Sequence, residues 1–109
     1  MKVKEFADRL NLKIISGGEG LEKEVSGVYV SDLLSWVMSH AEKGNAWITV
    51  HTHINTVAIA VLNDLSCIVI PENVEVEKAT VEKAKEEKVV ILSIEKTAYE
   101  ICLGAGKIL

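Results

Sequence analysis

The sequence predicts an α/β domain of three layers, in which a mainly parallel β-sheet lies between two layers of helices. Two observations support this fold class. From Ser31 onward, short apolar segments alternate with amphipathic helical segments, a pattern typical of right-handed strand–helix–strand units around a parallel sheet. The chain has 109 residues, close to the commonest domain size, and no linker composition, so we expect a single domain over residues 1–109.

Composition excludes several classes of protein. Apolar residues make up 49% of the chain and charged residues 26%, which is ordinary for a globular protein and excludes disorder over most of its length. The net charge of −4, with scattered lysines, argues against nucleic acid as the main partner. No apolar run approaches the roughly 18 residues of a membrane span, and the charged N-terminus does not resemble a signal peptide. We therefore expect a cytoplasmic protein without a nucleic-acid or membrane partner.

The N-terminal segments predict one helix and two strands. The first helix follows from apolar residues at positions i, i+3, i+4 and i+7, namely Val3, Phe6, Ala7 and Leu10. Residues 12–15 and 25–30 are expected to be strands that pair as a loose hairpin. The glycines between them, Gly17, Gly18 and Gly20, indicate a plain turn, because a phosphate-binding loop would be followed by a helix.

The alternation from Ser31 onward sets the later elements. Ser31 and Asp32 are favourable N-caps for a helix that ends near Ala41. Gly44 fits a left-handed position after that helix. The expected strands are 46–50, 67–70 and 89–94, and the expected helices are 33–41, 54–65, 77–88 and 97–103, followed by a tail over 104–109.

Residues 54–65 form the ambiguous segment, because their β-branched residues favour a strand. The segment is long for a strand, and parallel strands on either side of it need a crossover. We interpret it as a deeply buried helix, apolar almost all round. The charged helix over 77–88 is expected to turn Ala79 and Ala84 inward, and a T-x-x-E capping box at Thr97 opens the last helix.

His51 and His53 form the most informative pair of polar residues. They follow a predicted strand and precede a predicted helix, where exposed helix N–H groups attract anions. Thr52 and Asn55 could cap that helix or bind a ligand. Three interpretations remain open: polar residues at a turn, a ligand or anion site, and a metal site. A metal would need further ligands, and no Asp, Glu or Cys is close in sequence.

Several other residues indicate packing or association rather than chemistry. Cys67 and Cys102 are expected to be buried thiols. His40 follows Trp36 by one helical turn, so the two rings can stack on the surface. Trp36 and Trp47 are the candidate anchors of an apolar interface, which Met38 and Tyr29 could extend. Because two-fold dimers are the commonest oligomers, we expect a homodimer.

Four segments together resemble the DRTGG domain family. They are 27–34 (GVYVSDLL), 47–60 (WITVHTHINTVAIA), 67–72 (CIVIPE) and 89–92 (VVIL). The resemblance covers roughly residues 12–103 and extends to small stand-alone members of the family. It implies a three-layer α/β/α module, similar in fold to the N-terminal domain of HPr kinase/phosphorylase. Such modules are of a regulatory type and occur with CBS domains and in some phosphotransacetylases.

The chain departs from the family at the motif that names it. That motif is an Asp-Arg pair at a strand end, with glycines after the next strand. Here 51–53 (HTH) replaces the Asp-Arg region and 71–73 (PEN) stands where the glycines would be. HPr kinase acts through a separate P-loop domain that this chain lacks, so the resemblance implies no kinase activity.

The leading functional hypothesis is a non-catalytic regulatory or assembly module without a cofactor. It would bind a small anionic ligand, such as a nucleotide, a protein partner, or both, near His51 and His53. One alternative is a small enzyme or metal-handling accessory protein that uses these histidines. The other alternative is a purely structural dimerisation domain. No glycine-rich phosphate loop followed by Lys and Ser or Thr is present, so we expect no ATP hydrolysis and no kinase activity.

Overall fold

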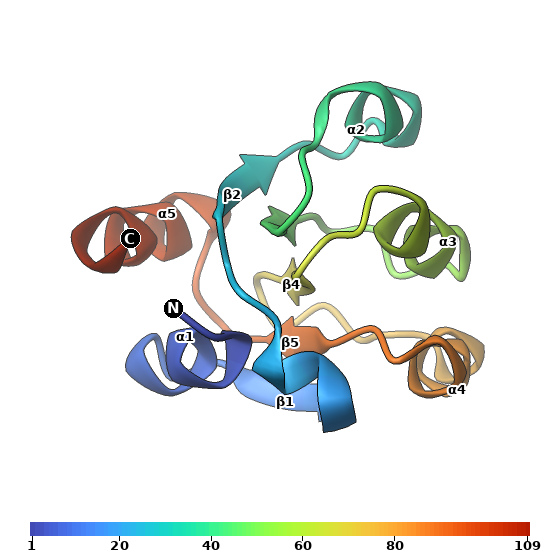
Figure 1. The fold of residues 1–109 in the computed structure, drawn as a ribbon, viewed down its shortest axis with the longest axis horizontal. Helices are drawn as coiled ribbons and strands as arrows, with labels where there is room; N and C mark the ends of the chain where they lie inside the picture. The colour runs from blue at the N-terminus through green and yellow to red at the C-terminus, as the bar shows by residue number, and fades with distance from the viewer.

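The computed structural model describes residues 1–109 and confirms the three-layer α/β class (Figure 1). A single sheet of five strands has the order β1-β5-β4-β3-β2. The strands are β1 (Lys13–Ser16), β2 (Gly27–Val30), β3 (Asn45–Ile48), β4 (Cys67–Ile70) and β5 (Ile91–Ser93). Neighbours from β2 to β5 pair in parallel, and only β1 is antiparallel, against β5.

Helices cover both faces of this sheet (Figure 1). α1 (Val3–Arg9) and α5 (Ala98–Ile108) lie on one face, and α2 (Leu34–His40), α3 (Asn55–Leu62) and α4 (Lys78–Glu87) lie on the other. Because β2 to β5 are adjacent in chain order, three successive right-handed crossovers place α2, α3 and α4 on the same face. A short 3-10 helix, η1 (Gly18–Glu22), follows β1. None of the helices has the length and apolar character that crossing a bilayer requires.

The sheet separates two apolar cores, because successive side chains of a strand point to opposite faces. Ile48 and Val69 belong to the core that α1 and α5 cover, together with the fully buried Phe6. Trp47 and Ile68 belong to the core under α2, α3 and α4. Continuous apolar strands therefore fit the middle of this sheet, where both faces are covered.

The helix interpretation of the ambiguous segment is confirmed, with one difference. Residues 55–62 form α3, which connects the parallel strands β3 and β4. The expectation that this helix is deeply buried is wrong on one side, because Val61 is 47% exposed and Leu62 is 68% exposed. One side of an apolar helix is therefore left uncovered.

The predicted hairpin between the first two strands is wrong. β1 pairs with β5 and β2 pairs with β3, so the two strands lie at opposite ends of the sheet. The turn between them is η1, which packs so closely on the segment between α4 and β5 that a Cβ at Gly20 would lie 2.7 Å from Val90 Cγ2. This close packing draws the chain away from β1 before β2 begins.

Trp47 is not an exposed interface anchor. It lies in the interior strand β3 with 0% exposure, and its indole Nε1 donates a hydrogen bond to the carbonyl of Ser31 at 2.9 Å. A tryptophan whose N–H has a partner can be buried without a lost hydrogen bond. Trp47 thus joins the end of β2 to the second core.

The predicted C-terminal tail is helical. The capping box at Thr97 is present as predicted, but α5 continues to Ile108. Its glycines do not end it, because Ala105 packs in the first core and a Cβ at Gly104 would lie 2.9 Å from Leu10 Cδ2. Close approach of α5 to α1 therefore outweighs the low helix propensity of glycine.

Candidate functional site

The residues singled out from the sequence lie at one edge of the sheet. His51, Thr52 and His53 connect β3 to α3, and Asn55 is the first residue of α3. Because β2, β3 and β4 are parallel, the loops after them meet at this edge. We call this edge the rim and define it as residues 31–33, 49–55 and 71–74. The predicted position of the four residues is confirmed.

Asp32, in the loop after β2, holds the loop after β3. Its Oδ1 accepts a hydrogen bond from Thr49 Oγ1 at 2.8 Å and another from the backbone N–H of Val50 at 3.0 Å. Thr49 is 2% exposed, and its Oγ1 accepts from the N–H of His51 at 3.2 Å. Asp32 is therefore not the helix N-cap that the sequence predicted, and no side chain caps α2. Its carboxylate instead joins the loop after β2 to the loop after β3.

Thr80, on α4, holds the same loop from the other side. Its buried Oγ1 donates to the carbonyl of Thr52 at 2.6 Å. The sequence predicted that Ala79 and Ala84 face inward, and Ala84 does, but Ala79 is exposed and Thr80 takes the inward position. The inward hydroxyl is satisfied by a loop carbonyl, which a hydrophobic pattern does not reveal.

His53 begins α3. Its Nδ1 accepts a hydrogen bond from the N–H of Asn55 at 3.2 Å, and its carbonyl accepts one from Thr56 Oγ1 at 2.8 Å. Because Nδ1 accepts, the proton of the neutral ring is on Nε2. His53 is exposed, so this Nε2–H donor is available to a ligand.

Three consecutive backbone N–H groups at the rim have no hydrogen-bond partner in the protein. They belong to Thr52, His53 and Ile54, directly before the eight-residue helix α3. The start of a helix carries partial positive charge and unsatisfied donors. Successive free N–H groups of this kind bind anions in many proteins. The rim loop thus offers backbone donors together with the imidazoles of His51 and His53.

The turn after β4 completes the rim. Glu72 and Asn73 both have left-handed backbones, with φ of 58° and 54°. Their N–H groups bond to the carbonyls of Lys96 and Ile94 at 2.9 and 3.0 Å. These hydrogen bonds hold the turn in a conformation that glycine adopts most easily.

The structure does not assemble a metal centre around the histidines. Nowhere do three or more side chains of His, Cys, Asp and Glu come together in a way that could hold a metal ion. The metal-handling alternative therefore has no ligand set to support it.

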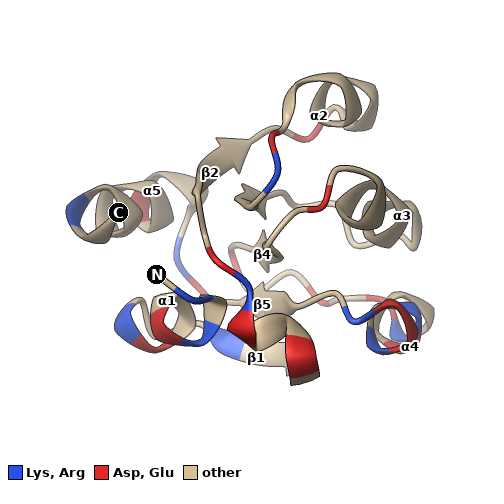
Figure 2. Ribbon diagram, in the orientation of Figure 1, with Lys and Arg blue, Asp and Glu red and all other residues tan.

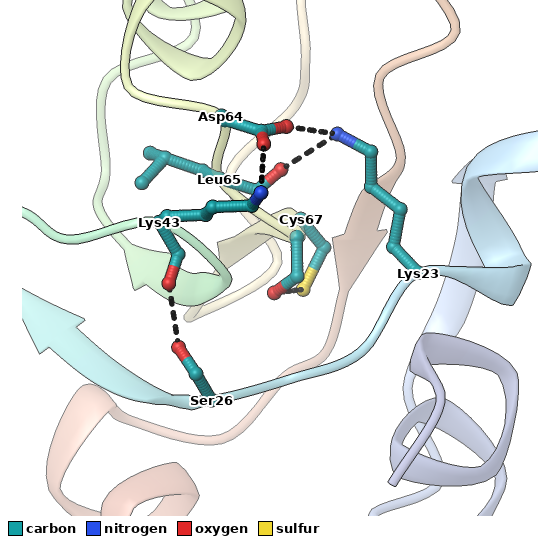
Figure 3. Close-up of polar contacts among 7 residues, drawn as sticks. Lys23, Ser26, Lys43, Asp64, Leu65 and Cys67 are labelled. Atoms are coloured by element: carbon teal, nitrogen blue, oxygen red, sulfur yellow. Dashed lines mark hydrogen bonds and ion pairs between the residues drawn. The ribbon is translucent and has the colours of Figure 1, made fainter.

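A second polar cluster lies at the amino ends of the parallel strands, opposite the rim, and Figure 3 shows its contacts. Asp64 pairs with Lys23 at 3.0 Å and with Lys43 at 3.6 Å, and Lys23 also donates to the carbonyl of Leu65 at 3.3 Å. These lysines, Lys23 foremost, hold the pKa of Asp64 below its usual value. The cluster joins the segments before β2, β3 and β4, so its groups already satisfy one another.

The predicted surface pair on α2 is confirmed. The rings of Trp36 and His40 stack with their centroids 3.9 Å apart and their planes at 14°. Both residues are exposed, Trp36 by 51%. Neither belongs to the rim.

Comparison with protein families and solved structures agrees with this architecture. The DRTGG domain model matches residues 5–104, and the chain therefore belongs to the DRTGG domain family. This confirms the family predicted from the sequence. A comparison with curated proteins finds no match.

One solved structure shows how this fold occurs in a larger protein. It is the crystal structure of the CBS and DRTGG domains of the regulatory region of Clostridium perfringens pyrophosphatase, complexed with its activator diadenosine tetraphosphate. The two structures superpose with a TM-score of 0.75 at 13% sequence identity, over 95% of this chain and 47% of the other. The present chain thus spans about half the length of that regulatory-region chain. At this identity the likeness establishes the fold.

Proposed function

We propose that this chain is a non-catalytic regulatory module that binds a small anionic ligand at the rim. The observation that carries the proposal is the row of free N–H groups at Thr52, His53 and Ile54. The imidazoles of His51 and His53 add donors on the same loop, and a phosphate group can accept several such hydrogen bonds at once. A regulatory role is supported by the family and by the regulatory region with which this fold is shared.

The ligand class that we infer is a nucleotide or another phosphate ester. Support comes from the rim, which offers donors for phosphate oxygens, and from the structural neighbour, which is complexed with a dinucleotide activator. Assembly is part of the proposal, because we expect the module to act as a homodimer. A reducing compartment such as the cytoplasm suits its two free cysteines, Cys67 and Cys102.

Calorimetric titration with inorganic phosphate, ADP and diadenosine tetraphosphate tests the ligand site. Ile54→Pro is the sharpest variant, because Ile54 has φ −55° and a free N–H. Proline fits that backbone angle and removes the donor. We expect Ile54→Pro and His51→Ala each to weaken binding by about 10-fold, the effect of one hydrogen bond to a charged group.

His40→Ala is the matched control, since His40 is an exposed histidine on α2 outside the rim. It should leave the affinity unchanged. Equal affinity of the wild type, Ile54→Pro and His51→Ala for each anion would contradict the rim as the binding site. Absence of any heat with all three anions would contradict the proposed function itself.

The module is also expected to be catalytically inert toward ATP. Incubation with labelled ATP should give no more phosphate than a buffer control, because the sequence contains no phosphate loop with the following Lys and Ser or Thr. Turnover that a point substitution in this chain abolishes would overturn this prediction and favour the small-enzyme alternative.

A further inference from the structure

The outer edge of β2 is an unpaired edge of the sheet that the ligand site does not use. β2 is the last strand in the order β1-β5-β4-β3-β2 and pairs only with β3. Figure 1 shows it at the free end of the sheet, with α2 on one face and α5 on the other. A strand in this position presents backbone donors and acceptors to any chain that can pair with it.

The register shows which backbone groups are free. The N–H of Thr49 donates to Val69 in β4, so Thr49 faces β4 and the alternate residues Ala46 and Ile48 face β2. In a parallel pair, such a residue bonds to the neighbours of its partner in register. Ala46 is in register with Val28, so Gly27 and Tyr29 face β3. Val28 and Val30 therefore direct their N–H and C=O groups outward.

These two residues are spaced for pairing with a second copy of the same strand. A two-fold axis through Tyr29 would place Val28 opposite Val30 of the second copy, and Val30 opposite its Val28. Both pairs would exchange two hydrogen bonds in antiparallel geometry. The two-fold axis also limits the assembly to two copies, since each copy uses the same surface.

The other outer strand of the sheet, β1, is protected against pairing with a further strand, and β2 is not. β1 begins with the exposed Lys13 and has an irregular register between Ile14 and Ser16. A lysine and a bulge are both features that prevent edge-to-edge association. β2 (GVYV) contains no charge, no proline and no irregularity in its register.

Apolar side chains flank the free edge on both faces. On the α2 side, Asn63 bonds to the carbonyls of Val37, Met38 and Ala41 and so marks the side of α2 that faces α3. At about 100° per residue, Trp36 lies on the opposite side of α2, away from α3. Figure 2 shows that α2 carries no lysine, arginine, aspartate or glutamate. An aromatic ring beside an uncharged strand is typical of interface centres.

On the α5 side a shallow hollow follows the strand. It has a volume of about 250 Å³, and its lining residues are Gly27, Val28, Cys102, Ala105, Gly106 and Leu109. Val30 lies on the same face of β2 as Val28, which lines this hollow, and is 50% exposed. A side chain from a second copy can therefore be received here without displacing the core.

The size of this end of the molecule suits a second copy. The molecule measures 31 × 26 × 24 Å, and the end closed by β2 spans all three layers (Figure 1). Its cross-section is on the order of 700 Å², which sets the scale of the surface available, against the ~800 Å² that each partner buries in a standard interface. We propose that β2 pairs antiparallel with β2 of a second copy and joins the two sheets into one. This inference rests on the homodimer that forms part of the proposed function.

Light scattering of Val30→Pro tests the proposal. Proline is tolerated on an edge strand whose N–H faces outward, so the monomer should fold while two of the four intermolecular donors are lost. We expect the wild type to have twice the chain mass of 11.9 kDa. Val30→Pro should dissociate at concentrations at least about 10-fold higher than the wild type. Leu62→Lys, on the exposed side of α3, is the matched control and should remain dimeric.

A cross-link keeps the test decisive if Val30→Pro does not fold. In the proposed register Tyr29 faces Tyr29 of the second copy as a non-hydrogen-bonded pair, whose Cα atoms are close enough for a disulfide. Tyr29→Cys, combined with Cys102→Ser, should give a covalent dimer on oxidation. A wild type that is monomeric at all concentrations would overturn the proposal. A dimeric Val30→Pro without this cross-link would also overturn it, and would assign the dimer to another surface. Binding of ADP by Val30→Pro then reports on the rim independently.

Discussion

At the scale of single residues, the side chain of Asp32 makes two hydrogen bonds that hold the rim loop, whereas the side chain of His53 makes one. The Oδ1 of Asp32 satisfies the buried hydroxyl of Thr49 and the N–H of Val50. We expect Asp32→Ala to lower the free energy of unfolding by about 1–3 kcal/mol, because a buried donor loses its acceptor. Asp32→Asn keeps an acceptor oxygen and should cost less.

Chemical denaturation measures this difference. Asp8→Ala is a suitable control, because Asp8 is exposed on α1 and its carboxylate makes no hydrogen bond or ion pair. If Asp32→Ala and Asp8→Ala are equally stable, Asp32 does not hold the rim loop.

Glu72 has a backbone conformation that is unfavourable for a residue other than glycine. Its φ of 58° lies in the left-handed region, which costs a non-glycine residue roughly 1–2 kcal/mol. Glycine removes that cost, but it lowers the free energy of unfolding by about 0.5–1 kcal/mol because it loses more conformational entropy on folding. We expect Glu72→Gly to raise the free energy of unfolding by up to about 1 kcal/mol. Denaturant titration checks this, and Glu75→Gly, at an exposed position without positive φ, should be neutral or destabilising.

At the scale of elements, η1 is joined to α1 through Glu22. The carboxylate of Glu22 pairs with Lys2 at 2.7 Å and with Lys4 at 3.0 Å. These hydrogen bonds, that with Lys2 foremost, lower the pKa of Glu22 from 4.5 to about 2. A carboxyl whose pKa is lower in the folded state stabilises that state above its unfolded pKa.

The contribution of Glu22 is therefore complete above about pH 4.5 and is lost as the pH falls to about 2. Thermal unfolding of the wild type and Glu22→Gln should differ near pH 6, and the difference should shrink through this window. Added salt should also reduce it, because the pair is exposed. Glu82→Gln is the control, since Glu82 is exposed on α4 and makes no ion pair. A constant difference between wild type and Glu22→Gln down to pH 2 would contradict the assignment.

The elements that the sequence predicted correctly are those with two concordant signals. α3 was recognisable because a crossover was needed between two apolar strands, and α5 because Thr97 opens it with a capping box. The end of α5 could not be predicted, since the close approach of Leu10 that favours glycine at position 104 is a tertiary contact. The pairing of β1 was equally hidden, because a four-residue strand does not encode which neighbour it joins.

At the scale of the whole molecule, the sheet order determined what could be predicted of the site. A parallel sheet brings strand ends together, so the sequence alone placed His51 and His53 at the rim. Asp32 and Thr80 were missed, because their roles depend on which elements lie beside β3. An acidic residue at the end of a neighbouring parallel strand was the signal that could have identified Asp32. Trp47 was misplaced for the same reason, as only the strand order shows that β3 is interior.

The sheet order also makes a prediction about stoichiometry. If two copies join through antiparallel β2 strands, their sheets run in opposite directions and their rims lie at opposite ends of the joined sheet. A ligand at one rim would then contact the donors of Thr52, His53 and Ile54 from a single chain. We expect calorimetry with ADP to give one ligand per chain without cooperativity. The affinity of Val30→Pro should lie within about two-fold of the wild type, because a side chain outside the rim contributes little to binding. One ligand per two chains, or loss of binding in Val30→Pro, would instead require the two rims to face each other, which the β2 pairing forbids.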